Sequence, residues 1–364
     1  MKNLLDEDYM KQAWRLARRG LGRTSPNPMV GAVIVRDHQI IGQGYHRYYG
    51  GKHAEVNAME SAVEDISGAT MYVTLEPCCY YGKTPPCVDA IIRNNIARVI
   101  IGVRDPNPQV NGRGMEILNN HGIETRVGVL EAECRSLNEA HFKYMMTGLP
   151  LVTVKFAQTL DGRIATSTGN SQWLSSPASR RFAHKLRTLN DAVMVGVGTV
   201  LADNPELTAR LVRGRNPTRI ILDSRLRIPL EARVLMEQES AKTIVTCTSA
   251  ADGKRLAALR QKKIEVLVIP EDERGEVSAK SLLEILGKRG ISSVLAEGGA
   301  EVITSLLRLK LADRLVAIIA PRIMGRGIEA VGELNITDVS QTLKLSFEKV
   351  RRMGEDVVIE ARVA

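Results

Sequence analysis

The chain has 364 residues, which is long for one hydrophobic core and favours two domains. Its apolar fraction of 44% and charged fraction of 25% are typical of a soluble globular protein, and no apolar run reaches the roughly 18 residues of a membrane helix. The net charge of +9 attracts anions, whether nucleic acid, phosphorylated metabolites or a phosphorylated pyridine dinucleotide, although 4% aromatic residues count against single-strand binding.

The first residues, MKNLLDEDYMKQAW, contain acidic side chains where a secretion signal needs an unbroken apolar stretch. We therefore expect a cytoplasmic protein. Three of the five cysteines fall within residues 78–87, which is a poor disulfide framework for a reducing compartment. Such clustering suits a metal site.

The first 147 residues alternate helices and strands. We expect a basic amphipathic helix over residues 5–20, a hairpin in MVGAVIVRDHQIIGQGYH that turns at residues 36–38, and a helix over about 53–63. A strand in GATMYVTLEP, a helix in CVDAIIRNN, a strand in RVIIGVRDP, a helix near GRGMEILNNHG and a strand in IETRVGVL follow. One helix over EAECRSLNEAHFKYMMTG ends at Gly148 and Pro150. The pattern predicts a sheet covered by helices.

A second set of strands begins at LPLVTVKFAQTLDGRIAT. Further strands are expected in DAVMVGVG, TRIILD, KTIVTC, IEVLVI, SSVLAEGG, RLVAIIAP and DVVIEARV, with helices between most of them. The prediction is an α/β protein of two domains, residues 1–147 and 148–364.

The stretches KHAEVNAME and TLEPCCYYGKTPPC bring together side chains that suit a catalytic zinc. Such a zinc takes three protein ligands and leaves a fourth position for water, and His53, Cys78 and Cys87 can supply those three. Glu55 follows His53 by two positions and can carry a proton from the water to a leaving amine. Zinc deaminases show H-x-E followed by P-C-x-x-C, but here eight residues separate Cys78 from Cys87. That insert is predicted to loop out and return Cys87 to a helix start, where a thiolate is favoured.

Other interpretations of this cluster stay open. A closed structural zinc site needs a fourth ligand, for which the near candidate is His46, beyond a Gly-rich bend. Cys79 is a surplus thiol, either structural or a further ligand. The same residues could also be buried core, although polar groups there are costly.

The second half contains no G-x-G-x-x-G, because Leu201 occupies the third glycine position of GVGTVL. SSVLAEGGAEVITSLL reads as strand, Gly-Gly turn and helix, and bare amides at a helix start can hold a phosphate. Gly-Gly turns also connect strands to helices with no ligand.

The segments SPNPMVGAVIV, HAEVNAM, YVTLEPCCYYGKTPPC and RDPNPQVNGRG resemble the deaminase half of the bifunctional riboflavin-biosynthesis deaminase/reductase, a cytidine-deaminase-like domain. The resemblance implies that His53, Cys78 and Cys87 bind Zn2+ and that Glu55 shuttles the proton. It also implies that the remaining residues of the site bind substrate, with the pyrimidine on Asn27 and His46 and the ribose phosphate on Lys83, Asp105 and Asn107. Asn27 and Asp105, beside prolines, could instead be turn formers.

One departure from the family pattern stands next to the first cysteine. The family usually has Ser-His there, and this chain has Cys79 and Tyr80. The contact made by that His must be lost, or replaced by Tyr80 or Tyr81.

The segments VTVKFAQTLDGRIA, SQWLSS, LRTLNDAVMVGVGTVLADNPELTAR, ILDSRLRIP and AEGGAEVITSLL resemble the reductase half of the same family, a dihydrofolate-reductase-like domain that binds NADPH. The resemblance places the cofactor against Ala157, Trp173, Thr199, Asp203, Ser224, Gly299, Ala300, Glu301, Val302, Ile303, Thr304 and Ser305. It places the phosphorylated substrate near Ser171, Arg187, Leu207, Arg210 and Glu297.

Four residues of this half allow a physical interpretation of their own. Arg187 and Arg210 could fork onto a phosphate. Trp173 could instead be a core aromatic. Lys155 could orient a sugar hydroxyl or be a solvated lysine at a strand end.

The combined hypothesis is a zinc-dependent hydrolytic deaminase acting on 2,5-diamino-6-(ribosylamino)pyrimidinone 5'-phosphate, followed by NADPH-dependent reduction of the ribosyl group to give 5-amino-6-(ribitylamino)uracil 5'-phosphate. This small phosphorylated pyrimidine would be the partner, without nucleic acid or membrane, and a homo-oligomer is expected. One alternative is a tRNA deaminase whose basic C-terminal half binds nucleic acid. The other is a binding module that a zinc ion with four protein ligands stabilises.

Overall fold

The computed structural model describes residues 2–364, and the side chains from residue 6 onward. The chain forms two compact units, Met1–Gly148 and Leu149–Ala364, and each is described by itself.

The first unit is built on a five-stranded sheet in the order β2-β1-β3-β4-β5. β1 pairs antiparallel with β2 and β3, whereas β3, β4 and β5 run parallel. The strands are β1 (Gly31–Arg36), β2 (Gln39–Tyr45), β3 (Thr70–Leu75), β4 (Arg98–Val103) and β5 (Glu124–Val127). The predicted hairpin is confirmed, and Asp37 and His38 make its turn with positive φ.

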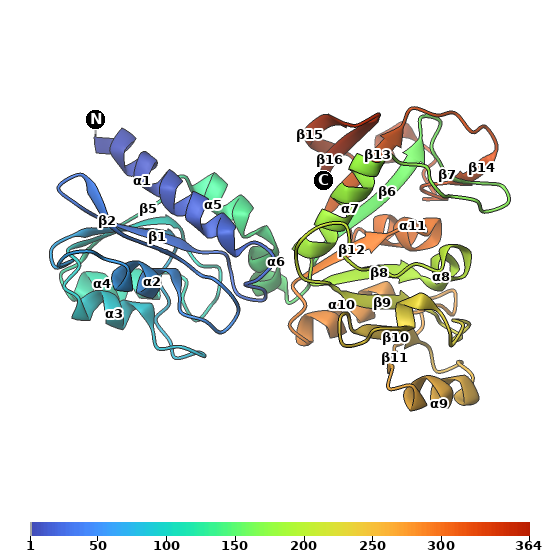
Figure 1. Cartoon of the computed structure of the whole chain (residues 1–364), viewed down its shortest axis with the longest axis horizontal. Coiled ribbons are helices and arrows are strands. Elements are labelled where there is room, and N and C mark those ends of the chain that lie inside the picture. The colour runs from blue at the N-terminus through green and yellow to red at the C-terminus, as the bar shows by residue number, and fades with distance from the viewer. Residues whose placement is uncertain (1) are drawn as a thin grey trace. The chain divides into compact units, whose positions relative to one another are not determined.

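Helices cover both faces of this sheet. α1 and α5 lie on one side, and α2, α3 and α4 lie on the other (Figure 1). The helices are α1 (Lys2–Ala17), continued by the 3-10 turn η1 (Arg18–Gly20), α2 (Ala54–Glu60), α3 (Cys87–Arg93), α4 (Arg113–Asn120), α5 (Glu131–Leu137) and α6 (Glu139–Thr147).

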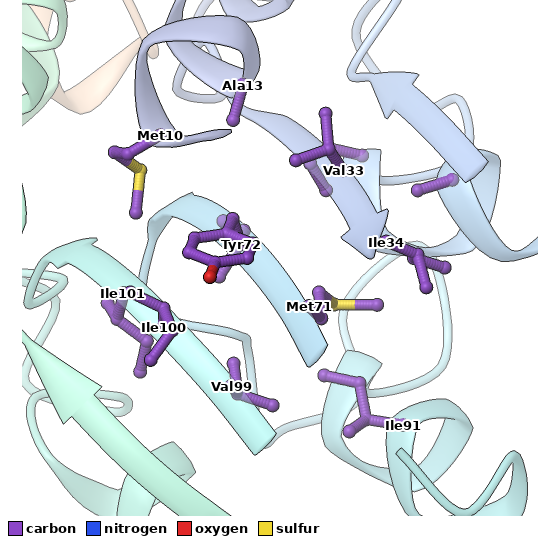
Figure 2. Close-up of a cluster of buried hydrophobic side chains, with 14 of the residues drawn as sticks. Met10, Ala13, Val33, Ile34, Met71, Tyr72, Ile91, Val99, Ile100 and Ile101 are labelled. Atoms are coloured by element: carbon purple, nitrogen blue, oxygen red, sulfur yellow. The ribbon is translucent and has the colours of Figure 1, made fainter. Parts of the chain in front are cut away.

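Alternation along the strands produces the two halves of the core. Val33 pairs with Tyr72 and Ile34 with Met71 across β1 and β3. Figure 2 shows Val33 directed toward Ala13 of α1, whereas Ile34 lies on the side of α3. Successive side chains on a strand point to opposite faces, so each strand supports both helical layers.

The prediction of one helix over residues 131–148 was wrong. Two helices, α5 and α6, meet at Asn138, whose φ is −113°. The Asn138 side chain accepts from the backbone N–H of Met29 over 2.7 Å and donates to its carbonyl over 2.9 Å. These two bonds tie Asn138 to another segment at the point where the helix breaks.

The second unit holds a nine-stranded sheet in the order β11-β10-β9-β8-β12-β6-β13-β16-β15. Its strands run parallel from β11 to β13, and β16 and β15 are added antiparallel. These strands are β6 (Leu151–Thr159), β8 (Ala192–Gly196), β9 (Thr218–Leu222), β10 (Thr243–Cys247), β11 (Glu265–Val268), β12 (Ser293–Glu297), β13 (Arg314–Ala320), β15 (Leu345–Met353) and β16 (Asp356–Val363).

The helices of this unit connect most of the parallel strands. They are α7 (Pro177–Leu189), α8 (Val197–Asp203), α9 (Gly253–Gln261), α10 (Ala279–Lys288) and α11 (Ala300–Arg308), with the 3-10 turns η2 (Arg233–Leu235) and η3 (Val339–Gln341). A small ladder pairs β7 (Arg163–Thr166) with β14 (Gly327–Glu329). The edge strand β15 was not predicted, because its side chains are exposed on most positions and follow no clear alternation.

Across the described residues, no helix is both long enough and apolar enough to span a membrane.

Candidate active sites

Three soft donor side chains meet at one point in the first unit. His53 is the N-cap of α2, Cys78 follows β3, and Cys87 is the first residue of α3, as predicted. His53 Nδ1 lies 3.3 Å from Cys87 Sγ and 3.5 Å from Cys78 Sγ, and the three ligand atoms lie within 4.8 Å of one another. Two helix starts and one strand end therefore assemble the predicted ligand set.

The two thiols differ in their readiness to bind a metal. Hydrogen bonding from Cys87, against the effect of burial, lowers the pKa of Cys78 to about 5. The hydrogen bond to Cys78, together with burial, raises the pKa of Cys87. Metal ligands must be deprotonated, so Cys78 is a ready donor at neutral pH. One imidazole nitrogen and two sulfurs form a donor set that fits zinc with an open position.

Glu55 lies in the first turn of α2 and is 3% exposed. Burial raises the pKa of its carboxyl, and the neighbouring His53 opposes that rise. A carboxyl whose pKa moves toward neutrality can both take up and release a proton. Glu55 is outside the ligand group and stands beside it, which suits a proton carrier.

His46 lies closer to the cluster than the Gly-rich bend implied. Its ring centroid is 5.4 Å from that of His53. Its Nδ1 lies 3.1 Å from the Lys52 carbonyl oxygen, and its Nε2 lies 3.3 Å from Asn27 Nδ2. Both ring nitrogens thus have partners, and His46 is not in the ligand group. The geometry brings the predicted pyrimidine-binding pair together and argues against a fourth protein ligand.

The insert between Cys78 and Cys87 supports His53 from outside. Thr84 Oγ1 lies 3.3 Å from His53 Nε2, the ring nitrogen that faces away from the thiols. A metal-binding imidazole ordinarily uses its other nitrogen in such a bond, which fixes the ring and its tautomer. Sequence reasoning missed Thr84, because a threonine in a loop carries no signal of its own.

Glu76 is a further residue that sequence reasoning missed. It is 3% exposed, and its carboxylate accepts from the backbone N–H groups of Asp105, Gly112, Gly114 and Met115 over 3.0–3.4 Å. Glu76 stands two residues before Cys78, so it connects the strand end that carries the ligand to the loop after β4. The carboxylate satisfies backbone donors that are buried or partly buried.

The loop after β4 carries two predicted substrate residues. Asp105 is buried, and its Oδ1 lies 3.3 Å from Nε2 of the buried His141 and accepts the Asn107 backbone N–H over 2.9 Å.

Lys83, the predicted phosphate ligand, holds its ammonium 3.9 Å from the ring centre of Tyr49. Such a cation–π contact places the charge without neutralising it.

Cys79 is not part of the ligand group. Its thiol donates to the Gln109 carbonyl over 3.4 Å. The structure therefore favours the structural role for this surplus cysteine.

A cavity of about 730 Å³ in the second unit gathers most of the predicted reductase residues. Cofactor residues that line it are Ala157, Trp173, Thr199, Asp203, Gly299, Ala300, Glu301 and Val302, and all five predicted substrate residues line it as well: Ser171, Arg187, Leu207, Arg210 and Glu297. Ser224 and Ser305 line a second cavity of about 540 Å³, which shares Glu301 and Val302 with the first. Ile303 and Thr304 line neither cavity and are buried, since they face inward from α11.

The contact of Arg187 with a phosphate stays a prediction, and the structure shows a protein partner for its guanidinium. Arg187 forks onto Glu297, with Nε to Oε1 at 2.6 Å and Nη2 to Oε2 at 2.9 Å, and its Nη1 donates to the Thr208 carbonyl. Burial would raise the pKa of Glu297, but Arg187 and Lys155 bring it down to about 2. Three of the five N–H donors of Arg187 thus already have protein acceptors, whereas Arg210, 44% exposed, pairs with Glu206 at 3.4 Å.

Lys155 is not a solvated lysine. It sits opposite Glu297 in the β6–β12 register, its side chain is 14% exposed, and its Nζ lies 3.7 Å from Glu297 Oε2. Burial lowers its pKa, and Glu297 opposes the shift. A buried ammonium on the cavity wall is placed to contact a polar ligand group.

Trp173 is 57% exposed, and the Arg180 guanidinium lies 4.3 Å from its ring centre, so it is not a core aromatic. Ser171 donates to Asp203 Oδ1 over 2.8 Å, which joins a predicted substrate residue to a predicted cofactor residue.

His184 also lines the cavity and was not predicted from the sequence. Burial, with Arg187 and Arg210, lowers its pKa to about 4, and its Nδ1 accepts the Leu211 N–H.

The Gly-Gly turn has the geometry of a phosphate cradle. Gly298 and Gly299 have φ of 73° and 76°, and Gly299 is the N-cap of α11. A Cβ on Gly299 would lie 3.1 Å from Thr199 Oγ1. Only glycine adopts this backbone freely, and the bare amides lead into a helix start on the cavity wall.

Four arginines that sequence reasoning missed line the second cavity: Arg225, Arg227, Arg274 and Arg308. Among the residues that the structure describes, no carboxylate pairs with their guanidinium groups. Asp272, Glu276 and Glu301 also line this cavity, so the arginines outnumber the carboxylates by one. Guanidinium groups without a carboxylate partner fit a ligand that carries phosphate. For Arg225 and Arg227 the signal lay in DSRLRIP, where two arginines alternate after a strand.

Known proteins resemble both units. Residues 4–103 match the family of the cytidine and deoxycytidylate deaminase zinc-binding region, and residues 150–359 match the RibD C-terminal domain. The chain is 46% identical to the riboflavin biosynthesis protein RibD of Aquifex aeolicus over 98% of both chains. A Thermotoga maritima diaminohydroxyphosphoribosylaminopyrimidine deaminase/5-amino-6-(5-phosphoribosylamino)uracil reductase is similar in structure, with 41% identity, a TM-score of 0.88 and full coverage of both chains. Acinetobacter baumannii RibD is 36% identical, with a TM-score of 0.91 over 100% of this chain and 99% of that one.

Proposed function

Because the chain belongs to the RibD family of bifunctional riboflavin-biosynthesis deaminase/reductases, we propose which of its residues perform each reaction and on which substrate. The protein is a deaminase with a zinc-binding region and an NADPH-dependent reductase, in a cytidine-deaminase-like and a dihydrofolate-reductase-like α/β fold. The substrate is a small phosphorylated pyrimidine.

The first unit carries the deamination. By analogy with the Thermotoga relative, its substrate is 2,5-diamino-6-(ribosylamino)pyrimidinone 5'-phosphate, which loses an exocyclic amine as ammonia. The observation that carries this assignment is the ligand group of His53, Cys78 and Cys87 with the buried Glu55 beside it. Zinc, when bound, supplies Lewis-acid activation of the attacking water.

The side chains of the first unit supply the remaining steps. Glu55 takes a proton from the attacking water and delivers it to the leaving amine, and its raised pKa suits both transfers. His46 and Asn27, held together at 3.3 Å, orient the pyrimidine. The ribose phosphate end lies against Lys83, Asp105 and Asn107.

The second unit carries the reduction of the ribosyl group to ribityl. NADPH, when bound, supplies the hydride. The amides at Gly298 and Gly299 hold its pyrophosphate, and the four arginines of the second cavity hold its ribose phosphate. Lys155 contacts a hydroxyl of the sugar, and Arg210 attracts the substrate phosphate. Glu297 fixes Lys155 and Arg187 in place on the cavity wall.

Replacing Glu55 with Gln separates the two activities. Glu55→Gln keeps the shape of the side chain but cannot carry the proton. Ammonia release should fall by at least about 100-fold, because general acid–base catalysis contributes 10²–10⁴-fold. NADPH oxidation on the deaminated intermediate should keep its rate. Loss of both activities together would contradict the two-site assignment.

In the tRNA-deaminase alternative the C-terminal half binds nucleic acid. Residues 150–359 instead match the RibD C-terminal domain, which is the reductase half of the family. A binding module with a closed metal site needs a fourth ligand, and His46 has both ring nitrogens engaged elsewhere. Neither alternative is supported by a specific contact.

Two further properties are part of the proposal. A homo-oligomer is supported by the edge strand β15, on which Phe347 is 64% and Val350 59% exposed, and light scattering that gives a multiple of 40.0 kDa would test it. A cytoplasmic location is supported by the zinc-binding thiols, which a reducing compartment keeps free, and cell fractionation would test it.

A further inference from the structure

The pair that departs from the family pattern, Cys79 and Tyr80, contacts the loop after β4. Asn107 Nδ2 lies 3.3 Å from Tyr80 Oη, and the Cys79 thiol donates to the Gln109 carbonyl over 3.4 Å. Tyr80 is 38% exposed. The adjacent Tyr81 is 77% exposed, and no described residue hydrogen-bonds its hydroxyl. Only the first tyrosine of the insert therefore reaches this loop.

The side-chain amide of Asn107 has one permitted orientation. Its Oδ1 accepts the backbone N–H of Gln109 over 3.0 Å, and its own backbone N–H donates to Asp105 Oδ1 over 2.9 Å. A rotation by half a turn about Cβ–Cγ would aim the NH2 group at the Gln109 N–H, and two donors would face each other. The NH2 group must therefore point toward Tyr80.

This orientation defines the role of the Tyr80 hydroxyl. Because the Asn107 NH2 group donates, the Tyr80 oxygen accepts. The second N–H of Asn107 remains free and can donate to an oxygen of a sugar or a phosphate.

We propose that Tyr80 is a positioning residue of the deaminase site: its hydroxyl oxygen, together with the Gln109 N–H, holds the Asn107 amide so that the second N–H of Asn107 donates to the ribose phosphate of the substrate. The inference rests on the proposed function, in which Asn107 binds that end of the substrate. Tyr80 acts on binding and not on the proton transfer, because Glu55 performs that transfer. Its effect is therefore on KM and not on kcat.

The experiment compares Tyr80→Phe with Tyr81→Phe in the full-length, zinc-loaded protein, by ammonia release. Tyr80→Phe should raise KM by roughly 3- to 10-fold, the size expected for one hydrogen bond, and leave kcat within about twofold. Tyr81→Phe should leave both unchanged. NADPH oxidation on the deaminated intermediate and the zinc content should be unchanged in both variants.

Asn107→Ala, alone and combined with Tyr80→Phe, completes a double-mutant cycle. In the Asn107→Ala background, Tyr80→Phe should add clearly less to KM than it does alone, because its partner is gone. An unchanged KM for Tyr80→Phe, a fall in kcat alone, or full additivity in the cycle would overturn the positioning role. An unchanged KM for Asn107→Ala would instead overturn the substrate role given to Asn107 in the proposed function, and the inference with it.

Discussion

Thr84 Oγ1 lies 3.3 Å from His53 Nε2, while His53 Nδ1 faces Cys78 and Cys87. The imidazole is thus held from both sides, by a hydroxyl and by two sulfurs. Thr84 belongs to the insert that separates the two cysteines by eight residues, where nucleobase deaminases have two. The longer insert therefore contributes to the order of the metal site itself.

Removing the Thr84 hydroxyl should weaken zinc binding. Thr84→Val keeps the shape of the side chain and loses the bond to His53, and changes of this kind cost 10- to 100-fold in metal affinity. Thr84→Ser keeps the hydroxyl and should bind zinc within about threefold of the original. Competition with a chromogenic chelator measures both affinities. Equal affinities for the Val and Ser variants would show that Thr84 does not support the ligand.

The preference of the reductase for NADPH over NADH should depend on the arginines of the second cavity. Arg225→Ala and Arg227→Ala should each raise the KM for NADPH by up to about 10-fold, because each removes a charge-assisted contact to phosphate. The rate with NADH, which lacks that phosphate, should stay within about twofold. Steady-state reduction of the deaminated intermediate with each nucleotide measures the difference.

Arg260→Ala is the matched control, since this exposed arginine of α9 does not line the cavity. An equal loss of reductase activity with NADPH and with NADH in the Arg225 and Arg227 variants would mean that these arginines do not bind the phosphate.

Stability at low pH should depend on Glu297. Its pKa is lowered from 4.5 to about 2 in the folded protein. A depressed pKa means that the unfolded state binds the proton first, so the carboxylate stabilises the fold fully above pH 4.5 and loses that effect as the pH falls toward about 2. Urea unfolding at pH 5 and pH 3 should therefore show a smaller pH-dependent loss for Glu297→Gln than for the original chain.

Glu301→Gln, an exposed residue in the first turn of α11, is the control for that comparison and should keep the original pH dependence. An identical loss of stability for the original chain and Glu297→Gln would rule out the ion pairs of Glu297 as its source.

Local patterns in the sequence predicted much of the fold and the metal site. The helix start at Cys87 and the turn at Asp37 and His38 follow from short-range spacing, as does the pairing of His53 with Glu55. The break at Asn138 was not predicted, and the contact that accompanies it is with Met29, 109 residues earlier. Long-range contacts of this kind leave no periodic signal.

The same reason explains the roles that sequence reasoning missed. The pairing of Arg187 with Glu297, 110 residues later, was not predicted. Glu76 holds the loop after β4 through backbone groups, which every sequence provides equally. Lys155 is buried because β12 places Glu297 opposite it, a pairing that becomes visible only when the strand order is known.

The most direct test of the two-site account follows both reactions in one sample. The purified protein is incubated with 2,5-diamino-6-(ribosylamino)pyrimidinone 5'-phosphate, with and without NADPH, and ammonia and NADPH absorbance are measured separately. Ammonia should appear without NADPH, and NADPH should be consumed only as ammonia is released. Removal of zinc with a chelator should stop both signals on this substrate and leave the reduction of the deaminated intermediate intact. NADPH consumption without ammonia release, or ammonia release that survives the loss of the metal, would contradict the account.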